Sequence, residues 1–395
     1  MQTLLFRRNS TARSMAAVAL GLLALAPTLA RAETLADRLE SAARAWHEAG
    51  QFDGAILVAR DGEVVWEGGF GPANREWDIP NAPGVRYPIA SLTKQFTAVL
   101  VMQCVERGEL SLEDTIVDRL PWYRADTGGR ITIRDLLSHS SGLPDVPVEQ
   151  YFDDRPEAED PSWGVRTYCS EDPVFEPGTD ISYTNTDYHV LGCILESVTK
   201  KTFEALLTER VLEPLGMKDT GVARRDRPLR HRADDYTESE GEPVNTPPYQ
   251  WENWHAAGCL YSTVDDLHRW NRALANHELL SVPATETMLT PRTDIGNQGN
   301  YVALGSWVYP RRLPGSDLAP VLVERRGAIG GYTVLNVLVK DEGQWITILS
   351  NHYNEMIHTL PWARCLPLDL LLVLNDLEPE GPESAGDGGA GGESP

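Results

Sequence analysis

Strand-forming patterns lie near both ends of this 395-residue chain and are scarce from about residue 110 to 275. Near the start, residues 54–67 hold two β-rich runs around Asp61-Gly62, a dipeptide typical of a two-residue hairpin turn. Near the end, residues 332–350 hold two further runs around a turn that contains Gly343. We therefore predict an α+β fold in which both ends of the chain build one antiparallel sheet beside a mostly helical lobe.

Three longer helices are predicted from apolar residues at helical spacing. The first spans 33–50 and the second 91–107, and each ends at or just before a glycine, a residue that often terminates helices. A third, apolar helix is predicted from about 355 to 374. The sequence contains no internal repeat, so a solenoid or a propeller is not expected.

The first 32 residues have the pattern of an export signal. Three arginines precede an apolar run at 15–30, and Ala30-Arg31-Ala32 is a small-x-small cleavage site. A membrane span is the alternative, but the run contains Pro27 and falls short of the roughly 20 residues that a bilayer requires. We predict that the signal is removed, that the protein is periplasmic or secreted, and that it has no stable membrane span.

The rest of the chain divides into one domain and a tail. Residues 377–395 form an acidic, glycine-rich segment that has no large apolar residue from Glu378 onward, so we predict that it is disordered. Residues 33–376 suit one catalytic domain with two lobes, of which the helical lobe would span about 110–275. A site is then expected between the two lobes.

Charge, cysteines and missing motifs exclude several function classes. The formal net charge is −23, and removal of the four arginines of the signal would make it more negative, which argues against nucleic acid as a partner. The five cysteines form no C-x-x-C pair and lack metal-ligand spacing, so we predict no metal, and expect burial for most of them. Their pairing is not readable from the sequence. A Gly-x-Ser-x-Gly elbow, a His-Glu-x-x-His motif and a phosphate loop are absent from the sequence.

A nucleophile and its base are indicated by Ser91-Leu-Thr-Lys94 at the start of the second predicted helix. Residues three apart share a helix face, so Lys94 can lie beside Ser91. The positive end of the helix dipole favours the negative charge of an attacked carbonyl oxygen, and a desolvated lysine can lose its proton and act as a base. The same spacing recurs at Ser197-Val-Thr-Lys200, but there it ends a helical pattern, and we interpret it as surface capping.

A second polar pair is Tyr183-Thr-Asn185, the only Tyr-x-Asn in the chain. Residues two apart in an extended segment point the same way, so the phenol and the amide can face one cleft. A tyrosine whose pKa is lowered by a nearby ammonium can relay protons, and the asparagine can hold a substrate amide. The alternative, for this motif alone, is a loop tyrosine beside a turn asparagine.

Taken together, the two motifs and a glycine-rich strand near residue 330 resemble the serine β-lactamase and penicillin-binding-protein superfamily. Finer motifs are similar to those of its class C branch, which includes β-lactamases, D-aminopeptidases, carboxypeptidases and esterases. These motifs are Leu-Leu-Ser-His-Ser-Ser-Gly-Leu at 136–143, Pro177-Gly178 and Ala-Gly-Cys-Leu-Tyr-Ser-Thr at 257–263. The resemblance spans roughly residues 35–374 and implies a β-lactamase/transpeptidase-like fold.

The resemblance also implies roles for individual residues. Ser91 would be acylated, Lys94 and Tyr183 would share the general-base and general-acid steps, and Asn185 would contact the substrate. The oxyanion hole would be formed by the backbone N–H groups of Ser91 and Ala328. The implied reaction is acyl transfer to water from a small molecule or peptide with an amide or ester bond, without a metal or an organic cofactor.

The third motif of that superfamily is altered here. It is Lys-Thr-Gly in β-lactamases and often His-x-Gly in the esterase and peptidase relatives, whereas this chain has Arg325-Arg326-Gly327-Ala328. Arg325 would take the place of the lysine or histidine, and with Gly327 and Ala328 it is predicted to bind substrate. A guanidinium cannot donate a proton as histidine does, but it can clamp a carboxylate. The alternative for Arg325 is a solvated charge on a strand.

Two further interpretations stay open at this point. His139 is expected to be structural, while Trp251, Trp254 and His255 either line the cleft or pack in the core. A protein with this fold could also have lost turnover and act as a receptor for cell-wall peptides or for a protein partner. The intact Ser91, Lys94 and Tyr183 argue against such a receptor, and the altered third motif argues for it.

Overall fold

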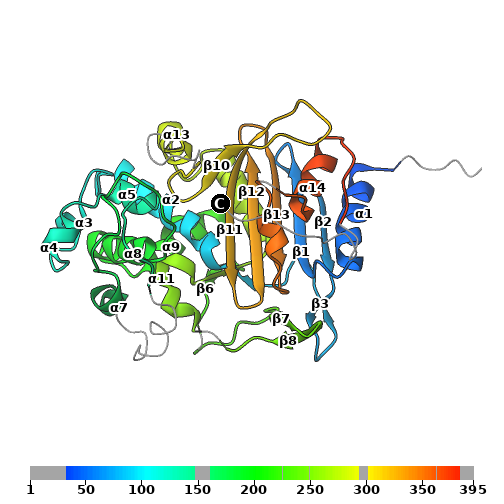
Figure 1. Cartoon of the computed structure of the whole chain (residues 1–395), viewed down its shortest axis with the longest axis horizontal. Coiled ribbons are helices and arrows are strands. Elements are labelled where there is room, and N and C mark those ends of the chain that lie inside the picture. The colour runs from blue at the N-terminus through cyan, green and yellow to red at the C-terminus, as the bar shows by residue number, and fades with distance from the viewer. Residues whose placement is uncertain are drawn as a thin grey trace, which may run out of the picture. The chain divides into compact units, whose positions relative to one another are not determined.

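The computed structural model describes residues 33–146, 161–224, 226–248, 250–292, 301–361 and 363–382. From Thr34 onward, the centre of the domain is a six-stranded antiparallel sheet with the strand order β10-β11-β12-β13-β1-β2 (Figure 1). Its strands are β1 (Gly54–Arg60), β2 (Glu63–Phe70), β10 (Trp307–Pro310), β11 (Val321–Ile329), β12 (Tyr332–Val339) and β13 (Gln344–Ser350).

Strands from the beginning and the end of the described domain meet in this sheet. Strand β1 pairs with β13 in a continuous register that runs from Gly54 opposite Ser350 to Ala59 opposite Trp345. The β1–β2 hairpin turns at Asp61-Gly62, and both of these residues have positive φ, at 55° and 81°. This backbone conformation is the one that an Asp-Gly turn supplies at low cost. The prediction of one antiparallel sheet built from both ends is therefore confirmed.

Helices cover both faces of the sheet. Alternate residues of a strand point to opposite faces, so each strand contributes side chains to two cores. On β1, Ile56 and Val58 pack in the core beneath α1 (Leu35–Glu48) and α14 (Leu366–Leu374). Leu57 points the other way, into a larger core shared with the helices of the second lobe. Figure 1 shows α1 and α14 on one side of the sheet and α2, α8 and α11 on the other.

The second lobe is mostly helical, as predicted. Its central helix α2 (Thr93–Glu106) is buried on all sides from Thr93 to Cys104, so it shows no apolar stripe. The other helical elements between the strands are η1 (Ala90–Leu92), α3 (Ile116–Arg119), α4 (Ala125–Gly128), α5 (Ile133–Leu137), α7 (Pro161–Tyr168), α8 (Thr186–Thr199), α9 (Phe203–Leu207), η2 (Thr208–Leu212), α10 (Glu213–Leu215), η3 (Trp251–Trp254), α11 (His255–Gly258), α12 (Val264–Ala275) and α13 (Val282–Leu289).

Short strands form smaller sheets of their own, separate from the central sheet. They pair as β3 with β4, β9 with β5 and β6, and β7 with β8. Their bounds are β3 (Pro72–Asn74), β4 (Ile79–Pro80), β5 (Tyr87–Pro88), β6 (Gly221–Val222), β7 (Tyr236–Ser239), β8 (Glu242–Asn245) and β9 (Leu260–Ser262). The strand β9 lies in the segment 257–263 singled out in the sequence, and the N–H of Ile89, just before η1, donates to Leu260 of β9 at 2.8 Å.

One element differs from its prediction, and the predicted tail is partly described. The apolar helix expected from 355 to 374 is two helices, η4 (Glu355–His358) and α14. Pro361 and Pro367 explain the break, because proline lacks the N–H that a continuous helix needs.

At the start of the predicted tail, Glu380 donates its N–H to Asp369 of α14 at 2.7 Å. The predicted signal at 1–32 and the tail from 383 onward lie outside the described residues.

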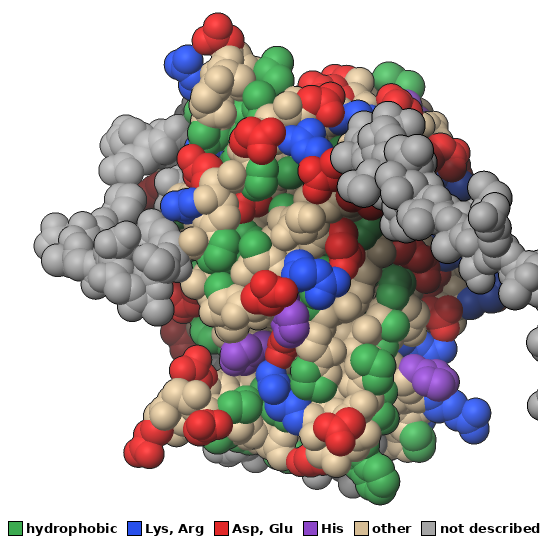
Figure 2. Space-filling model, turned by 90° about the vertical axis from the view of Figure 1, so that its right-hand side faces the viewer, with side chains coloured by type: hydrophobic (Ala, Val, Ile, Leu, Met, Phe, Trp, Pro, Cys, Tyr) green, Lys and Arg blue, Asp and Glu red, His purple; other side chains and the backbone are tan. Residues whose placement is uncertain are grey.

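The cysteine side chains are buried, and the surface carries charges of both signs. All five cysteine side chains are buried, as expected for most of them. Figure 2 shows the face at the right of Figure 1, where acidic and basic side chains are interspersed. Ion pairs on the domain include Arg38 with Asp376 at 3.8 Å and Arg60 with Asp376 at 3.7 Å. Within the described part of the chain, no helix has the length and apolarity needed to cross a membrane.

Candidate active site

Ser91 lies in the single turn η1, which leads directly into α2. The residue before it, Ala90, has a φ of 46°, in the left-handed region that costs an ordinary residue about 1–2 kcal/mol. This kink lets the chain enter the helix from β5 and places Ser91 at the amino end of α2. The sequence prediction that Ser91 opens a helix is therefore confirmed.

Lys94 reaches back to Ser91 from the first turn of α2. It is completely buried, and its Nζ lies 3.0 Å from Ser91 Oγ, 2.8 Å from Asn185 Oδ1 and 2.7 Å from the carbonyl oxygen of Ala257. Desolvation, followed by the positive charge of Arg325, holds the pKa of Lys94 well below its usual value of 10.5. Lys94 is thus poised to be a neutral amine.

The three contacts of Lys94 fit a neutral amine with its lone pair on Ser91. A neutral amine has two N–H groups and one lone pair. The oxygens of Asn185 and Ala257 can only accept, so they take both N–H groups, and the lone pair is left for the hydroxyl of Ser91. Lys94 can therefore receive the proton of Ser91.

Asn185 is oriented by Asp145, a residue that the motifs of the sequence do not indicate. Asp145 accepts from the backbone N–H of Asn185 at 2.7 Å and from its side-chain Nδ2 at 3.1 Å. Because a carboxylate only accepts, these bonds turn the amide oxygen of Asn185 toward Lys94. Asp145 follows Pro144 in a loop without a periodic pattern, so no signal in the sequence distinguishes it from other loop acids.

Tyr183 completes the group from a loop before α8. Its hydroxyl lies 2.7 Å from Ser91 Oγ, and its ring centre is 5.1 Å from Lys94 Nζ. A lowered pKa was expected from the sequence, but the pKa of Tyr183 is raised. Desolvation is the largest influence, and it outweighs the opposing effects of Arg325 and the Ser91 hydrogen bond. The phenol is therefore protonated at rest.

His139 is a buried neighbour of Tyr183 rather than part of the Ser91–Lys94 pair. It is 1% exposed, its ring centre lies 4.6 Å from that of Tyr183, and its Nδ1 is 3.3 Å from Asp187. Burial holds the pKa of His139 well below 6.5, so the ring is neutral. These contacts agree with the structural role expected for this residue.

The second Ser-x-x-Lys sequence lies far from this geometry. Ser197 and Lys200 stand at the carboxyl end of α8, where Lys200 caps the helix with a φ of 57°. The hydroxyl of Ser197 donates to the carbonyl of Arg119 at 3.0 Å. Their interpretation as a helix terminus without a nucleophile is consistent with this placement.

Strand β11 brings Gly327 and Ala328 to the other side of Ser91. A Cβ atom on Gly327 would lie 2.5 Å from the carbonyl oxygen of Ile89 and 2.9 Å from the amide nitrogen of Ser91. Only glycine therefore allows the strand to approach the turn η1 this closely. Ala328 follows with an exposed side chain on the wall of the cavity beside Ser91.

Arg325 is buried beside the catalytic group. Its side chain is 1% exposed, so it is not a solvated charge on the strand. Its Nε donates to the carbonyl oxygen of Ser91 at 2.9 Å, and its guanidinium lies 4.6 Å from the ring centre of Trp307 and 5.6 Å from that of Tyr183. Among the described residues that line the cavity at Ser91, Arg326 is present and Arg325 is not.

Comparison with known proteins assigns the chain to a family. Residues 36–362, most of the chain, match the family described as Beta-lactamase. The chain belongs to the Beta-lactamase family. The family assignment agrees with the resemblance drawn from the motifs at Ser91, Tyr183 and the strand near residue 330.

Two curated relatives are similar to this member of the Beta-lactamase family. Protein flp of Staphylococcus aureus (strain MW2) is 28% identical over 227 residues, 56% of this chain and 45% of that protein. The putative penicillin-binding protein PbpX of Bacillus subtilis (strain 168) is 28% identical over 307 residues, 77% of this chain and 72% of that protein. The chain thus matches less than half the length of the staphylococcal relative.

Solved structures share the fold. An octameric penicillin-binding protein homologue from Pyrococcus abyssi matches with a TM-score of 0.73 and 27% identity, over 87% of this chain and 78% of that chain. D-amino acid amidase from Ochrobactrum anthropi SV3 matches with a TM-score of 0.71 and 21% identity, over 87% of this chain and 99% of that one. At that identity the amidase shows the fold alone.

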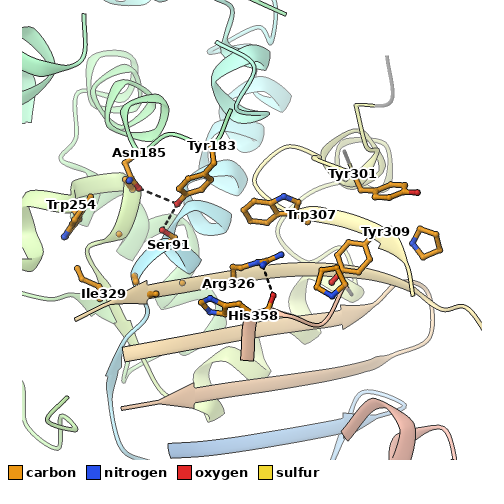
Figure 3. A pocket seen from close by; sticks show the side chains of 17 residues that line it. Ser91, Tyr183, Asn185, Trp254, Tyr301, Trp307, Tyr309, Arg326, Ile329 and His358 are labelled. Atoms are coloured by element: carbon orange, nitrogen blue, oxygen red, sulfur yellow. Dashed lines mark hydrogen bonds between the residues drawn. The ribbon is translucent and has the colours of Figure 1, made fainter. Parts of the chain in front are cut away.

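In this Beta-lactamase family chain, Ser91 opens onto a cavity of about 790 Å³ (Figure 3). Tyr183, Asn185, Gly327 and Ala328 line it together with Ser91. Trp254 also lines it, whereas Trp251 is buried against Tyr332 and His255 lies 3.2 Å from Glu196. Of the three residues left open by the sequence, Trp254 is therefore the one that reaches the cleft.

A metal site does not emerge from the described residues. Among them, no group of three or more His, Cys, Asp and Glu side chains has an arrangement that could hold a metal ion. The expectation that no metal or cofactor takes part stays a prediction.

Proposed function

We propose that this protein is a serine hydrolase, of the class C type, that forms an acyl-enzyme on Ser91 and transfers the acyl group of an ester or amide to water. One observation carries the proposal. Ser91 Oγ lies between the buried amine of Lys94, at 3.0 Å, and the phenol of Tyr183, at 2.7 Å. A base that can accept a proton and an acid that can donate one thus flank a single hydroxyl.

Acylation follows from these contacts. The hydroxyl of Ser91 gives its proton to the lone pair of Lys94 while Oγ forms a bond to the substrate carbonyl carbon. The bond to the leaving group then breaks, and the leaving oxygen or nitrogen takes the proton of Tyr183. The ammonium of Lys94 and the guanidinium of Arg325 stabilise the phenolate that remains on Tyr183.

Deacylation reverses the proton movements. The phenolate of Tyr183 takes a proton from water, whose oxygen attacks the acyl carbon. The bond from that carbon to Ser91 Oγ breaks, and Oγ takes back the proton held by Lys94. The acid is released, and both Lys94 and Tyr183 return to their starting states, so that protons and bonds balance over the cycle.

The attacked carbonyl oxygen needs hydrogen-bond donors during both steps. We assign this role to the backbone N–H groups of Ser91 and Ala328, which the close approach of Gly327 to η1 brings to the same side of the cavity. The loss of one such donor typically costs about 10²–10³-fold in rate.

The proposal is tested by labelling the protein with a fluorophosphonate and with a fluorescent penicillin, read by intact mass and by peptide mapping. A stable adduct on the peptide that contains Ser91 is the expected result, and heat-denatured protein is the control. If no acylating probe gives an adduct, the protein is instead a receptor with this fold. A panel of p-nitrophenyl esters, D-alanine p-nitroanilide and nitrocefin then separates esterase, peptidase and β-lactamase activity.

Export is also proposed, on the pattern of residues 1–32. The mature chain would begin near Glu33 and act in the periplasm or outside the cell. The intact mass of protein recovered from a periplasmic or culture fraction should lack the first 32 residues. Recovery of the full-length mass from the cytoplasmic fraction alone would contradict export.

Asp145→Asn is expected to slow acylation about 10- to 100-fold, because Asn185 loses the carboxylate that holds its amide oxygen toward Lys94. Asp145 also raises the pKa of Lys94, so its removal should lower that pKa further and move the acidic limb of the pH–rate profile to lower pH. Acylation is measured by rapid-mixing kinetics across pH. Asp180→Asn, at an exposed acid in the loop between α7 and α8, is the matched control. An unchanged rate and profile for Asp145→Asn would contradict this role.

Gly327→Ala is expected to reduce acylation by about 10²–10³-fold, because its new Cβ would push β11 away from Ser91 and open the oxyanion hole. Gly84→Ala is the matched control, since a Cβ at Gly84 meets no atom within 4 Å among the described residues. Ala328→Gly keeps the backbone N–H and should stay active. Normal acylation by a folded Gly327→Ala protein would show that the strand does not supply the donor.

A further inference from the structure

The cavity at Ser91 extends to both sides of the nucleophile, and the two sides differ. On one side lie Trp254 and Ile329, and on the other lie Trp307, Tyr301 and Tyr309 (Figure 3). The second side is thus walled by aromatic rings. Tyr301 and Tyr309 have ring centres 6.3 Å apart at an interplanar angle of 47°, so they form a corner that can receive a flat group.

The aromatic side is the one from which a leaving group departs, an assignment that rests on the proposed function. Tyr183 gives its proton to the leaving atom, so that atom must lie beside the phenol. The ring of Tyr183 is stacked on that of Trp307, with centres 6.1 Å apart and planes inclined by 26°. A leaving group held beside Tyr183 is therefore directed along Trp307 toward Tyr301 and Tyr309.

The charge of Arg326 on this side is compensated within the protein. Arg326 lines the cavity, but its Nε lies 2.8 Å from the fully buried Glu324 and its Nη1 donates to the carbonyl of His358 at 2.7 Å. Glu324 also accepts from the hydroxyl of Tyr309. Burial lowers the pKa of His358 to about 4, so this residue is neutral near pH 7.

A carboxylate on the leaving group would therefore gain little here. It would have to compete with Glu324 for Arg326, and it would lose its hydration among aromatic rings. Arg325 carries a second positive charge. It is not one of the described residues that line the cavity, and its guanidinium lies beside the rings of Tyr183 and Trp307. The walls favour a neutral, flat group that packs against aromatic faces and edges.

We propose that Trp307, Tyr301 and Tyr309 form a leaving-group subsite that selects esters and amides of neutral aromatic alcohols and amines. This selection separates the protein from hydrolases whose leaving group carries a free carboxylate, as a C-terminal amino acid does. The acyl side of the substrate would lie toward Trp254 and Ile329.

Three acetate esters with the same acyl group test the proposal: benzyl acetate, cyclohexylmethyl acetate and 4-carboxybenzyl acetate. Each kcat/KM is divided by the rate of hydroxide hydrolysis of the same ester, which removes differences in intrinsic reactivity. Benzyl acetate is expected to exceed cyclohexylmethyl acetate by about 3- to 10-fold, the range of aromatic pair interactions. The 4-carboxybenzyl ester is expected to fall at least about 10-fold below benzyl acetate, because its carboxylate is desolvated without a free partner.

Tyr301→Leu is expected to reduce the ratio of benzyl to cyclohexylmethyl ester to below about 2-fold. Tyr301 is 41% exposed, so its replacement should not impair folding, and Tyr353→Leu, at a tyrosine 42% exposed outside the cavity lining, should keep the wild-type ratio. Equal rates for the two neutral esters, or a faster 4-carboxybenzyl ester, in a protein that still forms the fluorophosphonate adduct on Ser91 would overturn the subsite and leave the hydrolase standing. Absence of both the adduct and ester hydrolysis would overturn the two proposals together.

Discussion

Ser91→Ala is expected to lower ester and amide hydrolysis by on the order of 10⁶-fold and to remove the fluorophosphonate adduct altogether. The reason is that the methyl side chain cannot form the acyl-enzyme, while Lys94 and Tyr183 keep their places but have no hydroxyl between them. Hydrolysis is measured with a p-nitrophenyl ester at saturating substrate, and adduct formation by intact mass.

The chain supplies its own control for this experiment in the second Ser-x-x-Lys sequence. Ser197→Ala changes the same residue type at the same spacing from a lysine, but at the far end of α8. It should acylate at the wild-type rate. If Ser91→Ala kept its adduct, the nucleophile would be elsewhere, and the assignment of Lys94 and Tyr183 would fall with it.

Lys94→Met should slow acylation by about 10²–10⁴-fold, the usual contribution of a general base. In the wild type, the neutral form of Lys94 is the active one, and its pKa is held well below 10.5 by burial and by Arg325. The acylation rate should therefore rise with pH through this lowered pKa and level off above it. Lys94→Met should lose that rise as well as the rate.

Lys200→Met provides the matched control, since it removes an exposed lysine from the second motif. Its rate and pH profile should equal those of the wild type. Lys94→Arg adds a second comparison, because a guanidinium keeps a positive charge but cannot accept a proton near neutral pH. An active Lys94→Arg protein would show that charge, rather than proton acceptance, is what the position supplies.

Local patterns predicted the parts of the fold that are decided locally. Asp61-Gly62 indicates its hairpin because few residues accept positive φ at both turn positions. The start of α2 and the end of α8 are likewise encoded in neighbouring residues. Ser91 differs from Ser197 because it lies at the start of a helix, whereas Ser197 lies near the end of one. The division of the last predicted helix was missed because apolar periodicity continues across Pro361.

Local patterns do not predict which side chains face the cavity. In strand β11, Arg325 and Arg326 must point to opposite faces, but the sequence does not say which face meets the cavity. The resemblance implied Arg325 for substrate binding, and in the structure it is Arg326 that lines the cavity. Asp145 and Trp307 reach the site only because a loop and a short strand pass it, which depends on the whole fold.

The raised pKa of Tyr183 shows a similar limit. A neighbouring ammonium was expected to lower that pKa, but desolvation lowers the pKa of Lys94 and raises the pKa of Tyr183. The protonation states of the two groups depend on each other through their shared environment. Spacing in the sequence identifies such partners, and three-dimensional burial decides which of them holds the proton.

The position of β1 between β2 and β13 affects how the domain can be made. The hydroxyl of Ser350 donates to the carbonyl of Asp53 across 297 positions in the chain. A ribosome must therefore complete nearly the whole domain before its first hairpin finds its neighbour, and contacts of such long range slow folding. Until then one edge of β1 is open to strands of other molecules. Nascent or truncated forms that end before Gln344 thus expose an unpaired edge of β1 that the complete domain covers.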